Sequence, residues 1–253
     1  MENFESNNNN AISHNEQKET LKFGNNIDLV VDLIRHAEKE SVEGGLSQKG
    51  KEWAYTYGEN IKTEFQDSAG VKIYYSPAKR TTQTAEEIKK GAETKYIPRE
   101  RKSLTLDGRI SDDFGNKLVE IINQNKGDES EAIQIMIDTG DKRIDEQSLS
   151  SKEYSKDLAK QLLLFVEMTK KFRDESKVNI VLVSHSGIIE HLLVDVLHMN
   201  RENFIKEIGG PVKFLEGARF EIKRENKENM EILFEFREHK YPISEEDLLN
   251  LGR

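Results

Sequence analysis

The chain has 253 residues, of which 35% are hydrophobic and 34% are charged, and its formal net charge is −9. This length allows one large domain or at most two small ones. The acidic balance argues against nucleic acid or an anionic membrane as a partner, because both need a basic face. The absence of cysteine excludes disulfides, thiolate zinc sites and a cysteine nucleophile.

Residues 1–26 are rich in Asn, Glu, Ser and Gln and show almost no periodicity, which is typical of a disordered tail. They lack the basic start and apolar stretch of a secretory signal. No run in the chain approaches the roughly 20 apolar residues that span a bilayer. We therefore expect a cytoplasmic protein whose single catalytic domain covers residues 27–253.

Order is predicted to begin sharply at Ile27, where a short, nearly continuous apolar run has the character of a buried parallel strand. After a loop, a helical pattern follows Leu46, and Ser47 is a suitable N-cap. Three apolar residues recur every four positions on this helix: Trp53, Tyr57 and Ile61.

Residues 71–76 form the next apolar run and predict a second strand. The helix expected after it has Pro77 in its first turn and Gly91 at its stop. A short strand is expected at 95–97. This alternation of strand and helix is typical of a layered α/β fold.

The stretch from about 98 to 148 is less regular, and we interpret it as an insertion that caps the carboxyl edge of the sheet. A capping box formed by Ser150 and Glu153 then opens a long helix. Residues 178–185 predict another buried strand, and two alternating runs between 218 and 236 predict a hairpin. The predicted fold class is a three-layer α/β/α sandwich with a mainly parallel central sheet.

Polar residues suited to binding phosphate follow three of these predicted strands. Arg35 and His36 end the first strand, and Arg80 lies in the helix after the second. His185 ends the later strand. Ligands of open α/β sheets bind beyond the carboxyl ends of the strands, so these side chains should converge. Two arginines and two imidazoles suit a phosphoryl group, since guanidinium donates in a planar fork and imidazole can donate or act as a nucleophile.

Four motifs resemble those of the histidine phosphatase (phosphoglycerate mutase-like) superfamily, in the same order and at similar spacing. Leu-Ile-Arg-His-Ala-Glu at 33–38 resembles the family's Arg-His-Gly motif, and Leu-Ser-x-x-Gly at 46–50 resembles its Leu-Thr-x-x-Gly segment. Ser-Pro-Ala-Lys-Arg-Thr-Thr-Gln-Thr-Ala at 76–85 resembles its Ser-Pro-x-x-Arg-Ala-x-Gln-Thr-Ala motif. Ser-His-Ser-Gly at 184–187 resembles its late His-x-Gly motif.

The resemblance implies a role for each of these residues. His36 would attack phosphorus and become a phosphohistidine, while Arg35, Arg80 and His185 would hold the phosphoryl oxygens. Fixed cationic donors compensate the charge on the equatorial oxygens of such a transition state without reorganisation. No cofactor is expected, and the sequence offers no convincing set of metal ligands.

The family's usual Leu-x-Glu segment, which carries the general acid, has no clear counterpart here. Asp107 is the nearest carboxylate, and Asp112 and Asp113 are rivals. Ala37 replaces the usual glycine after the nucleophile. The loop from 36 to 46 also lacks the Asn and Trp typical of true phosphoglycerate mutases.

These departures favour a phosphatase over a mutase, although a phosphomutase and a non-catalytic phosphate-binding protein remain as alternatives. The expected partner is a small phosphomonoester or a phosphorylated protein side chain. Neither the natural substrate nor the oligomeric state follows from the sequence.

Overall fold

The computed structural model describes residues 22–41, 44–66, 70–106 and 108–253. These residues form a seven-stranded sheet in the order β3-β2-β4-β1-β5-β6-β7. The strands are β1 (Ile27–Arg35), β2 (Gly70–Tyr75), β3 (Arg99–Glu100), β4 (Lys177–Ser184), β5 (Gly217–Arg224), β6 (Met230–Phe236) and β7 (His239–Ile243).

The sheet has a parallel half and an antiparallel half. Strands β3, β2, β4 and β1 run parallel to one another, whereas β5, β6 and β7 follow as antiparallel neighbours. The expected parallel centre and the β5–β6 hairpin are confirmed, and β7 extends the sheet beyond what the sequence predicted. Short turns join the antiparallel strands, while the parallel strands need helical crossovers.

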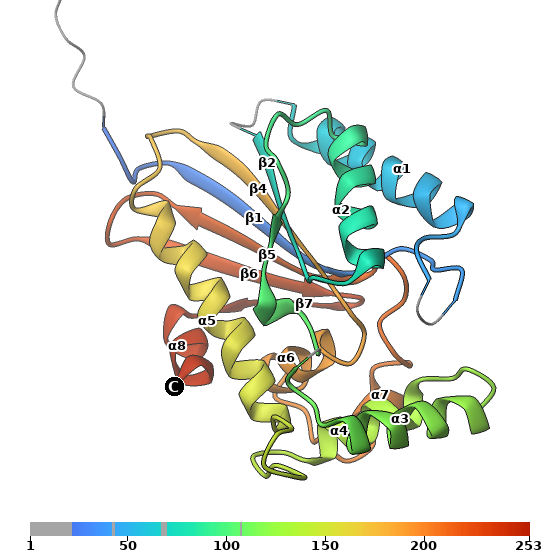
Figure 1. The fold of residues 1–253 in the computed structure, drawn as a ribbon. Coiled ribbons are helices and arrows are strands. Elements are labelled where there is room, and N and C mark those ends of the chain that lie inside the picture. Colours follow the sequence, from blue (N-terminus) through green and yellow to red (C-terminus); the bar gives the residue numbers. More distant parts are fainter. Residues whose placement is uncertain (1–21, 42–43, 67–69, 107) are drawn as a thin grey trace, which may run out of the picture.

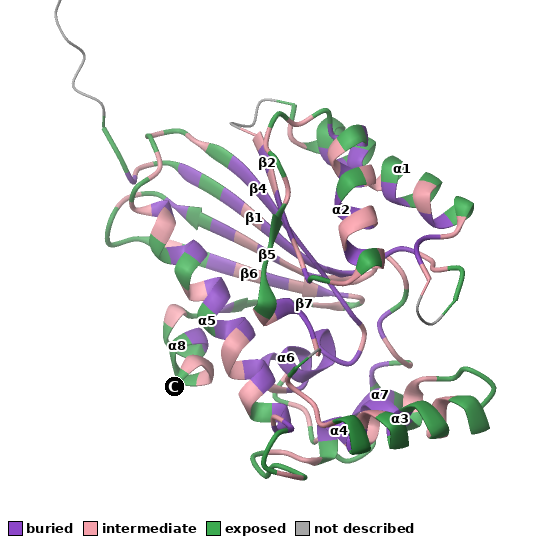
Figure 2. Ribbon diagram, viewed as in Figure 1, coloured by how far each residue is buried: buried purple, intermediate pink, exposed green. Residues whose placement is uncertain are grey.

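Helices cover both faces of the sheet and confirm the three-layer sandwich (Figure 1). They are α1 (Gln48–Glu64), α2 (Lys79–Gly91), α3 (Asp112–Gln124), α4 (Ser130–Asp138), α5 (Ser151–Thr169), α6 (Ile189–Val196), α7 (Phe204–Glu207) and α8 (Glu245–Gly252). Helices α1 and α2 pack on one face, and α5 and α6 pack on the other. Buried residues concentrate along the central strands β1 and β4, as expected for strands covered on both sides (Figure 2).

The packing of α1 corrects the apolar stripe that the sequence suggested. Trp53 is 42% exposed, and the buried positions of α1 are Gly50, Ala54, Gly58 and Ile61. A Cβ on Gly58 would lie 2.3 Å from the carbonyl oxygen of Ile88, and one on Gly91 would lie 2.0 Å from that of Tyr55. Small residues thus let α1 and α2 approach closely, which explains Gly91 better than a helix stop does.

The segment 98–148 differs from the prediction in detail. The short strand lies at β3 rather than at 95–97, where Ile97 is exposed. The segment contains two helices, α3 and α4, and α4 was not predicted at all. Both lie apart from the sheet layers, below the carboxyl ends of the parallel strands in Figure 1, as a cap should. The capping box of Ser150 and Glu153 at the start of α5 is confirmed.

The last residues of the predicted tail belong to the fold. The backbone amide of Gly24 donates to Phe172 O at 2.9 Å, and the amide of Asn25 donates to Asp174 Oδ1 at 3.0 Å. Residues 22–26 therefore dock on the turn after α5, which corrects the end of the tail from 26 to before 22. The rest of the predicted tail lies outside the described residues. No helix in the described ranges has the length and apolarity needed to cross a membrane.

Candidate active site

The parallel half of the sheet places four predicted site residues together. Arg35 ends β1 and pairs in register with Ser184, which ends the neighbouring parallel strand β4. His36 and His185 are the next residues of the two strands, so their rings meet with centroids 5.3 Å apart. Arg80 reaches the pair from the first turn of α2. The convergence predicted from the strand ends is confirmed.

His36 is held as a neutral imidazole whose Nε2 is the acceptor nitrogen. The ring is 2% exposed, and its Nδ1 lies 2.7 Å from Ala37 O. A carbonyl only accepts, so Nδ1 carries the proton. Nε2 then accepts a hydrogen bond from Arg80 Nε at 3.1 Å. Burial, and then the charges of Arg80 and Arg35, lower the pKa of His36 to about 3. The ring is therefore a competent nucleophile at neutral pH.

His185 has the opposite tautomer. Arg80 Nη2 lies 3.2 Å from His185 Nδ1, and because guanidinium only donates, Nδ1 accepts. His185 Nε2 must then carry the proton, which it donates to Ser76 Oγ at 2.6 Å. Burial and the neighbouring Arg80 hold the pKa of His185 well below its usual value. A single guanidinium, that of Arg80, thus aligns both imidazoles.

One N–H group of the Arg35 guanidinium has no acceptor among the described residues. Its Nη1 donates to Val212 O at 2.9 Å, and its Nη2 lies within 2.9 Å of both carboxylate oxygens of Glu129. The guanidinium stacks on Phe214, 4.5 Å from the ring centroid. Its buried Nε has no hydrogen-bond partner among the residues that the structure describes. A buried, charged N–H without an acceptor is costly, and a phosphoryl oxygen would satisfy it.

The remaining residues of the motif at 76–85 support the site from α2. Thr84 Oγ1 accepts from the Ala37 amide at 3.1 Å, and Gln83 Oε1 accepts from the Leu46 amide at 2.7 Å. Both bonds tie the loop after His36 to the helix that carries Arg80. The threonine and glutamine of this motif therefore fix the loop that follows His36.

Glu190, which the sequence did not single out, holds the loop after β4. Its buried carboxylate accepts from Ser186 Oγ at 2.8 Å, from the Gly187 amide at 2.7 Å and from the Val212 amide at 2.9 Å. Val212 O is in turn the acceptor for Arg35. One carboxylate thus fixes both the loop next to His185 and the partner of Arg35.

The four residues line a cavity of about 280 Å³ between the strand ends and the cap. Among the described residues, its charged lining consists of Arg35, Lys39 and Arg80 against a single carboxylate, that of Glu129. The cavity therefore carries net positive charge in a protein whose overall charge is −9. Such a cleft attracts an anionic substrate in spite of the sign of the whole surface.

None of the described carboxylates that were proposed as the general acid lines the cavity. Asp107 lies outside the described residues, although Thr105 and Leu106, just before it, line the cavity. Asp112 and Asp113 are exposed in the first turn of α3 and do not line it. Glu129 does line it, and the sequence analysis did not identify this residue. The described residues contain no cluster of His, Cys, Asp and Glu that could hold a metal ion.

The sequence matches the family model described as the histidine phosphatase superfamily (branch 1) over residues 31–213, well over half of the chain. The chain belongs to the histidine phosphatase superfamily. No curated protein matches the sequence.

Solved structures of low sequence identity share the fold of this superfamily member. A mycobacterial glucosyl-3-phosphoglycerate phosphatase with inorganic phosphate is 18% identical with a TM-score of 0.56, and the match covers 84% of this chain and 97% of that one. A mycobacterial hydrolase is 16% identical with a TM-score of 0.56, and the match covers 85% and 100% of the two chains. The phosphoglycerate mutase-like fold expected from the motifs is confirmed.

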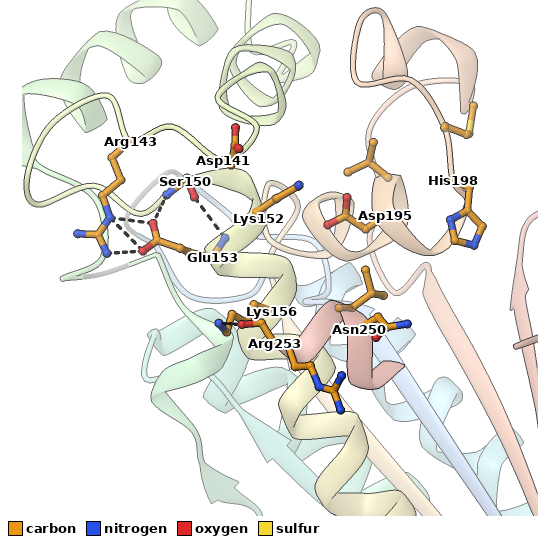
Figure 3. A pocket seen from close by; sticks show the side chains of 13 residues that line it. Asp141, Arg143, Ser150, Lys152, Glu153, Lys156, Asp195, His198, Asn250 and Arg253 are labelled. Carbon is orange, nitrogen blue, oxygen red and sulfur yellow. Dashed lines mark hydrogen bonds and ion pairs between the residues drawn. The ribbon is translucent and has the colours of Figure 1, made fainter. Parts of the chain in front are cut away.

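A second, larger cavity of about 900 Å³ lies between α5, α6 and α8. Most of its charged side chains bond to protein groups: Arg143 pairs with Glu153, and Lys156 donates to Arg253 O (Figure 3). Asp195 is bound by Arg201. It contains none of the motif residues, so the smaller cavity is the better candidate for catalysis.

Three buried neutral histidines should make stability depend on pH. Burial lowers the pKa of His36 and of His191 to about 3 and lowers that of His185. His191 stacks on Tyr154 and hydrogen-bonds Ser151 Oγ, so its role is packing. Between pH 6.5 and about 3 the unfolded chain binds protons that the folded protein does not. Within this window, each histidine should therefore lower the free energy of unfolding by about 1.4 kcal/mol for each unit by which the pH falls.

Urea unfolding at pH 7, 6 and 5 measures this loss. The variant His191→Gln, whatever its absolute stability, should show a shallower fall because one of the three groups is gone. A slope equal to that of the wild type would show that His191 is not neutral in the folded protein.

Proposed function

We propose that this protein is a metal-independent phosphomonoester hydrolase that acts through a phosphohistidine on His36. The observation that carries the proposal is the fixed tautomer of His36: Nδ1–H is bound to Ala37 O, and the Nε2 lone pair is held beside Arg80. The buried, unpartnered Nε of Arg35 gives an incoming phosphoryl oxygen a donor.

The reaction has two displacements. His36 Nε2 forms a bond to phosphorus while the ester P–O bond breaks, and the leaving alkoxide takes a proton from a general acid. Water then attacks phosphorus, the P–N bond breaks, and the water's proton returns to the same acid, now a base. Arg35 and Arg80 hold the equatorial oxygens throughout. His185 joins them after its Nδ1 takes the proton of the monoanionic phosphomonoester, because the N–H that it has in this structure is on Nε2 and donates to Ser76 Oγ. Asp107 is the proposed acid.

The substrate is proposed to be a small phosphomonoester or a phosphorylated protein side chain in the cytoplasm. A direct test is hydrolysis of an aryl phosphate in ¹⁸O-labelled water with chelator present. The proposal expects one labelled oxygen in each phosphate released. Phosphoryl transfer to a second phosphomonoester without label would instead indicate a mutase. Tight binding of vanadate with no turnover would indicate a binding protein.

A further inference from the structure

The half of the active-site cavity that faces the cap is apolar. Every residue that α3 and α4 contribute to the cavity wall is apolar or glycine: Gly115, Leu118, Val119, Ile122, Ala132, Ile133 and Met136. Leu106 and Ile110, which precede α3, continue this lining. Among the described lining residues, the charged side chains come from outside α3 and α4: Arg35, Lys39, Arg80 and Glu129. The cavity is therefore divided between an anionic group and an apolar group.

The apolar half keeps surface available for a ligand. Val119 is 44% exposed, and Leu106, Ile110 and Ile122 are half-buried. Their neighbours Leu118 and Met136 are buried against Phe114 and Tyr154 in a small core of their own. The exposed apolar area is thus supported from behind by packed side chains, as the wall of a preformed ligand site is.

The two halves meet at the loop that carries His185. A Cβ built on Gly187 would lie 3.9 Å from Ile133 Cγ1 and from Met136 Sδ, and 4.0 Å from Leu106 Cδ1. Apolar side chains therefore reach within van der Waals distance of the residue two positions after His185. A phosphomonoester held by Arg35 and His185 would have its ester substituent beside these side chains.

We infer that the substrate is a phosphomonoester of an apolar alcohol, an alkyl or aryl phosphate, an inference that rests on the function proposed above. A sugar or other polyol would leave its hydroxyl groups against α3 and α4, whose lining side chains offer no hydrogen-bond partner. An alkyl or aryl group would instead gain by leaving water. The volume of about 280 Å³ limits the group to the size of a small molecule.

A series of n-alkyl phosphates tests this inference, because their leaving groups differ little in chemistry beyond ethyl. We expect kcat/KM to rise about fourfold for each methylene from ethyl to hexyl phosphate, the factor that corresponds to burial of one methylene. Glycerol 3-phosphate, the hydroxylated counterpart of propyl phosphate, should be at least about tenfold poorer than propyl phosphate. A flat series, or a preference for glycerol 3-phosphate, would overturn the inference.

A variant that fills the apolar half localises the effect. A Cβ on Gly115 would meet nothing within 4 Å, so Gly115→Phe should fold and occupy the cavity. It is expected to lower the ratio of kcat/KM for hexyl to that for ethyl phosphate by at least about tenfold. Asn116→Phe adds the same ring at the next, exposed position of α3, outside the cavity lining, and should keep the wild-type ratio. Equal ratios in both variants would place the apolar contact elsewhere.

Binding separates failure of this inference from failure of the proposed function. Ethylphosphonate and hexylphosphonate cannot be hydrolysed at the P–C bond, and calorimetry with the intact protein measures their affinities. Tighter binding of hexylphosphonate without turnover of any phosphate would support the apolar site and overturn the hydrolase. Turnover with equal affinities for the two phosphonates would support the hydrolase and overturn the apolar substrate.

Discussion

Replacing His36 with asparagine should lower kcat for an aryl phosphate by about 10⁴-fold or more, the usual scale for removal of a covalent nucleophile. Asparagine has no nitrogen lone pair that can attack phosphorus. The proposed phosphate-binding groups Arg35 and His185 remain, so KM should change far less than kcat. Steady-state kinetics in chelator measures both values. Rapid quenching with a ³²P-labelled substrate should label the wild-type protein and leave His36→Asn unlabelled.

The matched control is His239→Asn on β7, remote from the cavity lining, which should retain wild-type kinetics. His36→Asn must also be folded, and its thermal melting curve shows whether it is. A folded His36→Asn protein that keeps more than about a tenth of the wild-type kcat would contradict the phosphohistidine mechanism.

The placement of His36, Arg80 and His185 could be predicted from sequence because each residue directly follows a recognisable strand or lies in the first turn of the next helix. Parallel pairing places the carboxyl ends of the strands at the same edge of the sheet. The register of Arg35 opposite Ser184 then brings His36 next to His185. Local patterns sufficed here since the geometry of the sheet brings distant residues together.

Glu129 could not be predicted, and the reason is physical. It bonds to Arg35, which is 94 positions away in the sequence. It is also the N-cap of α4, a helix that was not predicted. The cap residue is glutamate, and its side chain makes no capping hydrogen bond. The Asp and Ser that could mark a helix start lie on either side of this cap, where Asp128 Oδ1 accepts from the Ser130 amide at 2.9 Å.

The apolar wall of the cavity could not be predicted from the sequence for a different reason. The residues Leu118 and Ile122 on α3 have the same spacing as ordinary core residues. Leu118 does pack into a core, together with Phe114, while both line the cavity. Hydrophobic periodicity alone cannot distinguish a face that packs against protein from one that also borders a ligand site.

The second large effect concerns the proton donor. Asp107→Asn should lower kcat/KM for an alkyl phosphate by about 10²- to 10⁴-fold, the usual contribution of general acid catalysis. The same change should have a much smaller effect on p-nitrophenyl phosphate, because its leaving group departs readily without a proton. Comparison of the two substrates therefore distinguishes loss of the acid from general damage to the site.

Glu129→Gln is the matched comparison, since Glu129 is the carboxylate that lines the described cavity. Glu129 pairs with Arg35, whose Nη2 donates to Glu129 Oε1 and lies 2.8 Å from Oε2, so Glu129 competes with phosphate for this guanidinium. We therefore expect Glu129→Gln to alter KM, with equal effects on the alkyl and aryl substrates. If Glu129→Gln shows the loss confined to alkyl phosphates and Asp107→Asn does not, Glu129 is the acid.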